Sequence, residues 1–251
     1  KWGGIFQFTE RGAQELCKRV KPDNLIDIST ITSIYRPGPL SAGVDNDYLQ
    51  AKANPDEVKY IHPIHREITE ETYGFLIFQE QIALLAHKLG KDISLDEGNK
   101  LRKLFTKKGG GSKDTLKESL RRRFTEGCME KGITMVEAHD MWTTFEYFSG
   151  YGFNKSHAVA YSMIGYQCAY LMNYYPAEWL ASYLDKDLSK DKDRRQKGIN
   201  LVKSHGFDIH KPDVNQSGAF WEVSKSDPNV LIQPLTNIDG VGDKAIDEIL
   251  K

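Results

Sequence analysis

The densest group of charged side chains lies between residues 100 and 123. This segment holds ten basic and two acidic residues, a net charge of +8, whereas the whole chain of 251 residues has a formal charge of −1. Positive charge concentrated in this way attracts a polyanion, and binding to nucleic-acid phosphates should weaken as salt rises. A solvated helical surface would have the same composition, but we favour contact with phosphate. The basic residues are Lys100, Arg102, Lys103, Lys107, Lys108, Lys113, Lys117, Arg121, Arg122 and Arg123.

A second candidate is the run GYGFNKSHA at residues 150–158. Its two glycines permit a sharp turn, and Asn154 or Ser156 can cap the helix that we expect to follow. The amides of a first helical turn, backed by the helix dipole, form a natural phosphate site. Lys155 and His157 add two donors at the same place. The alternative is an ordinary start of a helix. No Walker-type Gly-Lys-Ser/Thr pattern is present, which excludes a P-loop.

Three further patterns are weaker. Gly240 and Gly242 lie between two short expected helices, as in helix-hairpin-helix DNA binders, although a tight turn explains them equally well. The His62-Pro63-Ile64-His65 run fits a plain loop better than a metal site, because a proline intervenes and no cysteine is near. The aromatic residues after Asn154 mostly follow helical spacing, which favours the interior or an interface over base stacking. They are Tyr161, Tyr166, Tyr170, Tyr174 and Tyr175.

The chain offers no evident catalytic set. Metal-dependent nucleotidyl transfer needs acidic residues clustered around two cations, usually on adjacent strands. The Asp-x-Asp pairs at 45–47, 185–187 and 191–193 lie in polar stretches instead. No persuasive Ser/His/Asp or Cys/His arrangement occurs. We therefore predict no catalytic residue and no metal ligand in this chain.

The composition is that of a soluble globular protein, with 39% hydrophobic and 27% charged residues. No apolar run is long enough for a membrane helix and no signal peptide is present. The three cysteines are far apart and form no Cys-x-x-Cys pair, which fits a reducing cytoplasm and disfavours structural zinc. Because the chain starts at Lys1 without a methionine and stops at Lys251 inside an expected helix, we expect a fragment.

Most of the chain is expected to be helical. Capping boxes, Ser94 with Glu97 and Thr134 with Glu137, should begin two helices. A further helix should start near Pro22 and stop before the Arg36-Pro37-Gly38-Pro39 turn, because proline disfavours helical geometry in the preceding residue. Residues 73–78 suggest a short strand, and the glycines at 109–111 suggest a break between two basic helices. The predicted helices span 22–35, 79–89 with Gly90 as C-cap, 94–105, 134–148, and a long one from Asn154 to Pro176.

Several short motifs, taken together and in order, resemble the alpha subunit of bacterial DNA polymerase III, a C-family polymerase. Each is modest alone, but they cover nearly all of the chain. They are Ile5-Phe6-Gln7 with Arg11-Gly12, Tyr35-Arg36-Pro37-Gly38-Pro39-Leu40 with Gly43, Tyr73-Gly74 with Gln79-Glu80-Gln81, Leu101-Arg102-Lys103 with Lys107-Lys108, Gly150 through His157 with Ala160-Tyr161, Tyr175-Pro176-Ala177-Glu178, Pro212-Asp213-Val214-Asn215, and Gly240-Val241-Gly242.

The resemblance implies a mainly α fold. Residues 1–185 would form a multi-helix fingers domain with a few short strands. Residues 186–251 would form a linker and a small, partial helix-hairpin-helix module. The family's catalytic aspartates belong to a palm domain, and none of them maps onto this chain. The fragment alone should therefore be inactive, and the Mg²⁺ ions would be held by the missing palm.

The resemblance also implies site roles. Asn154, Lys155, His157, Arg36, Arg102 and Lys103 would face the incoming deoxynucleotide. Lys107, Lys108, Lys113, Lys117, Arg121, Arg122, Arg123, Gly240 and Gly242 would contact DNA. Partners would be primer-template DNA, the dNTP, the palm, and the sliding clamp and other replisome subunits through the full-length protein, with no membrane.

The expected location is a bacterial cytoplasm, and the unusual 109–112 loop leaves a phage-encoded source open. Two alternatives remain: a stand-alone DNA-binding or replisome-interaction protein derived from polymerase fingers, and one half of a split polymerase.

Overall fold

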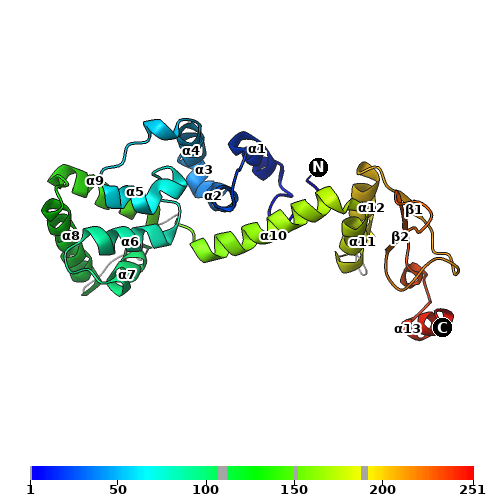
Figure 1. The fold of residues 1–251 in the computed structure, drawn as a ribbon. Coiled ribbons are helices and arrows are strands. Elements are labelled where there is room, and N and C mark those ends of the chain that lie inside the picture. Colours follow the sequence, from blue (N-terminus) through cyan, green and yellow to red (C-terminus); the bar gives the residue numbers. More distant parts are fainter. Residues whose placement is uncertain (1, 107–111, 150–151, 188–191) are drawn as a thin grey trace. The chain divides into compact units, whose positions relative to one another are not determined.

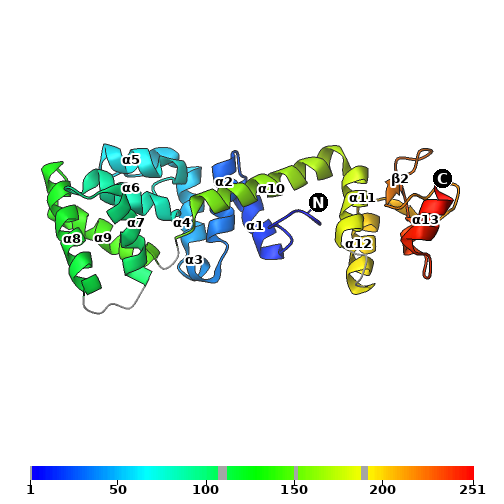
Figure 2. The same cartoon turned by 90° about the horizontal axis from the view of Figure 1, so that it is seen from below.

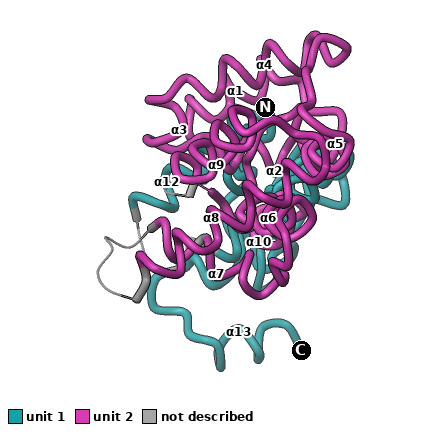
Figure 3. The backbone as a smooth tube through the Cα atoms, turned by 90° about the vertical axis from the view of Figure 1, so that its left-hand side faces the viewer, with its two compact units in different colours: residues 1–9, 164–251 teal, residues 10–163 magenta. Residues whose placement is uncertain are grey.

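A computed structural model describes residues 2–106, 112–149, 152–187 and 192–251 (Figure 1). The chain divides into two compact units, one of residues 10–163 and the other of residues 1–9 with 164–251 (Figure 3). The division falls within helix α10 (Lys155–Tyr174). Within the described residues, no helix combines the length and apolar character needed to cross a bilayer.

The unit of residues 10–163 is helical, which confirms the mainly α prediction. Its strongest packing pairs α6 with α7 and α8 with α9, and these four helices lie together in Figure 2. The elements before α10 are α1 (Arg11–Val20), α2 (Leu25–Ile34), α3 (Pro37–Ser41), α4 (Val44–Ala53), the 3-10 turn η1 (Pro55–Glu57), α5 (Pro63–Thr69), the 3-10 turn η2 (Glu70–Thr72), α6 (Gln79–Leu89), α7 (Leu95–Thr106), α8 (Ser112–Glu130) and α9 (Met135–Ser149).

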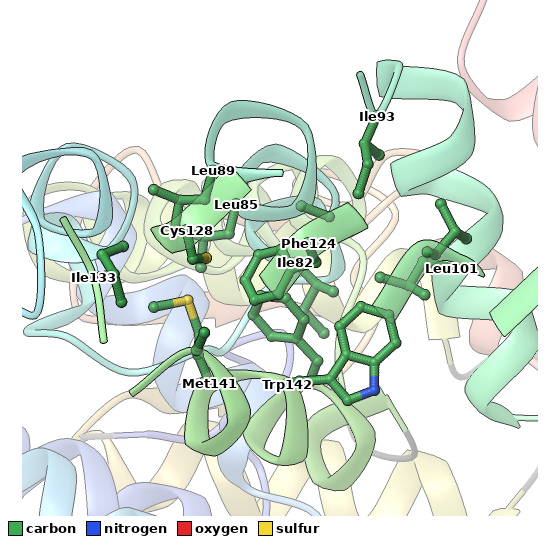
Figure 4. Packing of buried hydrophobic residues seen from close by; sticks show 14 of the residues in the cluster. Ile82, Leu85, Leu89, Ile93, Leu101, Phe124, Cys128, Ile133, Met141 and Trp142 are labelled. Atoms are coloured by element: carbon green, nitrogen blue, oxygen red, sulfur yellow. The ribbon is translucent and has the colours of Figure 1, made fainter. Parts of the chain in front are cut away.

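The core of this unit lies between α6, α7, α8 and α9. Trp142 of α9 is almost fully buried among Phe124, Phe145 and Leu101 (Figure 4). Truncating such an aromatic side chain typically costs about 3–5 kcal/mol. The backbones also approach closely, because a Cβ on Gly127 of α8 would lie 2.3 Å from the amide nitrogen of Lys91.

The other unit contains a short sheet of order β1-β3-β2. Strand β1 pairs with β3 in parallel, with Asp208 opposite Val230, and β2 pairs with β3 antiparallel. Leu180, Trp221 and Leu231 lie in its core. The elements after α10 are α11 (Pro176–Asp187), α12 (Lys192–Ser204), β1 (Asp208–His210), β2 (Glu222–Val223), β3 (Val230–Ile232), the 3-10 turn η3 (Leu235–Asn237) and α13 (Asp243–Ile249).

Predictions that rested on local signals are confirmed. Helix α6 spans 79–89 with Gly90 as its C-cap. In the first capping box, the Glu97 amide donates to Ser94 Oγ at 3.2 Å and the Ser94 amide donates to Glu97 Oε2 at 2.9 Å. The Thr134 and Glu137 box has the same reciprocal bonds. Helix α10 ends just before Pro176, as expected.

One predicted helix boundary and one predicted strand are wrong. Helix α2 begins at Leu25 rather than Pro22, because the Asn24 side chain accepts the Asp27 amide and is the N-cap. Residues 73–78 are not a strand; only Phe78 pairs, in an isolated parallel bridge with Phe153.

Two expected loops are also partly helical. Arg36 is extended as predicted, but Pro37 then occupies the first turn of α3 instead of a turn. His62–His65 is not a plain loop, since His62 caps α5 through its ring nitrogen and His65 is buried.

The domain boundary near Lys186 stays a prediction, as does the helix-hairpin-helix module. The glycine break at 109–111 lies outside the described residues.

Candidate functional site

The start of α10 is fastened to the start of α6 by consecutive side chains. Gln79 Nε2 donates to the Gly152 carbonyl at 2.7 Å. The carboxylate of Glu80 accepts from Asn154 Nδ2 at 2.7 Å and from the Lys155 amide at 2.9 Å. A hydrogen bond to a charged acceptor is stronger than a neutral one. The two segments, more than 70 residues apart in sequence, are therefore fixed to each other.

Gln81, the next residue, fixes the chain that leads into α6. Its Oε1 accepts from the amides of Ile77 and Phe78, each at 2.9 Å, and its Nε2 donates to Thr72 Oγ1 at 2.8 Å. The side chain is buried, so leaving these groups without partners would cost about 1–3 kcal/mol each. We call Gln79, Glu80 and Gln81 the clasp.

Of the two N-cap candidates for α10, Asn154 and Ser156, the structure has Asn154. Its Oδ1 accepts the His157 amide at 2.9 Å. The first-turn amides of Lys155 and His157 are thus already bonded to Glu80 and Asn154. A carboxylate occupies the place where the sequence suggested a phosphate, so an incoming phosphate would meet side chains rather than these two amides.

Three of the predicted cationic or titratable side chains gather beside this junction. The Arg36 guanidinium lies 5.2 Å from the centre of the Phe153 ring, and the His157 ring lies 5.6 Å from it. His157 also stacks on Tyr161 at 4.0 Å. The Lys155 ammonium lies 5.6 Å from the Phe78 ring. The fold thus brings Arg36 to the run that begins at Gly152, from which it is distant in sequence.

The ammonium of Lys155 forms an ion pair with Glu71 of η2. Nζ lies 2.5 Å from Oε1 and 2.7 Å from Oε2 of that carboxylate. Both side chains are about one third exposed, so the pair is open to solvent and to a competing anion.

Arg123 of the basic segment is bonded to protein groups. Its guanidinium lies 2.5 Å from Glu97 Oε1 and donates to the Asp92 carbonyl at 2.8 Å. The Arg123 guanidinium and the Ser94 amide hold the pKa of Glu97 at about 2, well below its ordinary 4.5. This arrangement favours a structural role, and DNA contact by Arg123 stays a prediction.

The other described cations of α8 also have acidic or aromatic neighbours. Lys117 lies 2.9 Å from Glu146 and 5.1 Å from the Phe105 ring. Arg121 lies 3.0 Å from His139 Nδ1. Arg122 is the most exposed, at 72%, and its nearest acidic atom, on Glu126, is 3.9 Å away. Glu97, Glu126 and Glu146, which lie near the cations of α8, therefore offset part of the +8 charge counted for residues 100–123.

The remaining predicted residues are less informative. Lys103 is exposed on α7. Gly240 has a φ of 86°, and Gly242 is the N-cap of α13. Lys107 and Lys108 lie outside the described residues, as do the side chains of Arg102 and Lys113.

Sequence reasoning missed Glu71 and Glu80. Their partners lie 84 and 75 residues away, so no helical or strand periodicity links them. The one available signal was the Gln79-Glu80-Gln81 motif itself, three adjacent polar residues at the start of an apolar helix.

Comparison with known proteins gives one consistent result. The family model described as the bacterial DNA polymerase III alpha subunit finger domain matches residues 1–132. The chain is 34% identical over 247 residues to the DNA polymerase III subunit alpha of Aquifex aeolicus, which covers 97% of this chain and 20% of that protein. The DNA polymerase III subunit alpha of Bacillus subtilis is 34% identical over 250 residues, which is 99% of this chain and 21% of that protein.

The Chlamydia trachomatis subunit is 36% identical over 248 residues, which is 99% of this chain and 19% of that protein. The chain thus spans about a fifth of the length of the curated relatives it matches. With the family model covering more than half of the sequence, the chain belongs to the family of finger domains of the bacterial DNA polymerase III alpha subunit.

Proposed function

We propose that this chain holds the incoming deoxynucleoside triphosphate and the primer-template DNA within a replicative DNA polymerase. The observation that carries the proposal is the convergence of Arg36, Lys155 and His157 on the Phe78 and Phe153 rings. Arg36 and His157 lie against Phe153, and Lys155 lies against Phe78, which pairs with Phe153 in the isolated bridge beside the clasp.

The part assigned to these residues is charge neutralisation and positioning. The planar guanidinium of Arg36 suits two phosphate oxygens. The ammonium of Lys155 acts as a point charge with three donors. Placed against a transferring phosphoryl group, such charges stabilise the negative charge that develops on it.

Metal chemistry would come from elsewhere in the full-length protein. In polymerases of this kind two metal ions stabilise the attacking and leaving oxygens. In the described part of the chain, no three His, Cys, Asp or Glu side chains come together in a way that fits a metal ion.

The DNA contact is proposed for the exposed basic side chains. Arg122 is the strongest described candidate because it is largely exposed and only loosely paired. Lys117, which is partly exposed and paired with Glu146, would add to it at lower strength. Such contacts fix position on the backbone and carry no sequence information.

The test is Lys155→Ala in the full-length polymerase that carries this chain. We expect kcat/KM for the nucleotide to fall about tenfold or more, the usual scale for losing a charge-assisted hydrogen bond. DNA affinity should stay nearly unchanged. Lys88→Ala is the matched control, because Lys88 forms a similar exposed pair with Glu67, 2.6 Å away, on another part of the unit.

Equal nucleotide kinetics for Lys155→Ala and the unmodified enzyme would refute the nucleotide role. Primer extension by this chain, with and without a separately made palm polypeptide, distinguishes the alternatives. Extension restored by the palm would indicate a split enzyme, and extension by the chain alone would contradict the division of roles proposed here.

A further inference from the structure

The carboxylate of Glu71 binds the Lys155 ammonium, which is the group that the proposed function assigns to the nucleotide. Nζ has three donors, and it lies within 2.7 Å of both carboxylate oxygens of Glu71. Those oxygens are anionic acceptors, as phosphate oxygens are. Because the pair is about one third exposed on each side, a phosphate can approach the ammonium from solvent.

The position of Glu71 is fixed by its backbone. It lies in the middle of η2, and Tyr73 and Gly74 follow in left-handed conformations with φ of 52° and 86°. Thr72 Oγ1 donates to the Phe75 carbonyl at 2.7 Å and accepts from Gln81 of the clasp. The clasp thus holds both partners: Gln81 fixes the turn that carries Glu71, and Glu80 fixes the amide of Lys155.

We propose that Glu71 is an internal competitor of the nucleotide: its carboxylate holds the Lys155 ammonium until a phosphate group displaces it. This inference rests on the proposed function. Glu71 is then a positioning residue that sets the apparent affinity for nucleoside triphosphates without touching them. Removing its negative charge frees the ammonium and strengthens nucleotide binding. The contrary outcome, weaker binding, would mean that Glu71 holds Lys155 in its productive position.

The experiment uses Glu71→Gln in the full-length polymerase, with single-nucleotide incorporation measured at saturating primer-template. We expect KM for the dNTP to fall about two- to fivefold, the range that an exposed ion pair allows, with kcat unchanged. Glu70→Gln is the matched control. It removes the same charge from the adjacent residue, whose carboxylate pairs with Arg66 at 2.7 Å instead.

A double variant isolates the mechanism. In a Lys155→Ala background, Glu71→Gln should leave KM unchanged, because the ammonium for which the carboxylate competes is gone. A KM that is unaltered or raised by Glu71→Gln alone would overturn the inference, and so would an equal fall in Glu70→Gln. The proposed function fails on a different result: normal nucleotide kinetics in the Lys155→Ala enzyme.

Discussion

The basic side chains of α8 separate into those bonded to protein groups and those that face solvent. Arg123 is 23% exposed and bridges α8 to the start of α7 through Glu97 and the Asp92 carbonyl. Arg122, one residue earlier, is 72% exposed. On a helix, adjacent residues point about 100° apart, so neighbouring arginines in one run acquire different roles.

The ion pair of Glu97 and Arg123 predicts a dependence of stability on pH. Glu97 releases its proton near pH 2 when folded and near its ordinary 4.5 when unfolded. Between about pH 2 and pH 4.5 the unfolded chain therefore binds more protons than the folded chain. The contribution of the Glu97 ion pair to the free energy of unfolding is complete above about pH 5 and is lost as the pH falls towards 2. Glu97→Gln should lower the free energy of unfolding most at pH 7 and progressively less in acid.

Urea unfolding at a series of pH values checks this. Glu126→Gln is the control, because its carboxylate is 3.9 Å from Arg122 and both side chains are largely exposed. A difference between Glu97→Gln and the unmodified chain that stayed constant down to about pH 3 would show that the pair is not the cause.

Among the secondary-structure elements, α10 begins with contacts to a residue distant in sequence. Its N-cap, Asn154, is local, but the carboxylate that meets its first amide is Glu80 of α6. Glu80→Ala would leave that amide and the Asn154 side chain without an acceptor.

We expect Glu80→Ala to lower the free energy of unfolding by about 1–3 kcal/mol. Chemical denaturation measures this. Glu67→Ala, which removes an exposed carboxylate paired with Lys88, should change stability by much less. Equal losses in the two variants would mean that the contact between α6 and α10 contributes little.

The elements that could be predicted are those specified by nearby residues. The boxes at Ser94 and Thr134 connect residues three apart, and the apolar face of α6 repeats within one helix. The strand predicted at 73–78 is wrong because its pairing depends on a residue distant in sequence. Residues 76–78 of this run are buried, but one bridge between Phe78 and Phe153 replaces a ladder, and no local pattern reveals that partner.

The candidate site was predictable in part. Lys155, His157 and Arg36 could be named from motifs, and the fold sets Arg36 and His157 against Phe153 and Lys155 against Phe78. Glu71 and Glu80 could not, because a carboxylate is as common on a solvated surface as in an ion pair. Their significance comes only from the fold, which sets them against residues 154–155.

For the molecule as a whole, charge distribution matters more than the total of −1. Polyanion binding depends on cations that are free to release counterions from phosphates. Because Arg122 is exposed and Arg123 is engaged with Glu97, we expect the two to affect DNA binding differently.

Arg122→Ala should reduce the slope of log affinity against log salt by about one, the amount expected for one phosphate contact. Arg123→Ala should leave the slope nearly unchanged and lower the melting temperature instead. Fluorescence anisotropy of a labelled primer-template in a salt series measures the slope. An unchanged slope in Arg122→Ala would exclude that residue as a phosphate contact.

The clasp also has a kinetic consequence. Since Gln79 and Glu80 bind the backbone that leads into α10, the Lys155 main chain is anchored, and only side-chain torsions remain to carry the ammonium from Glu71 to a ligand. Torsions of exposed side chains relax within picoseconds to nanoseconds, whereas hinge motions take microseconds or longer. If Lys155 binds the nucleotide as proposed, the exchange of one anion for another at its ammonium needs no hinge motion of the backbone.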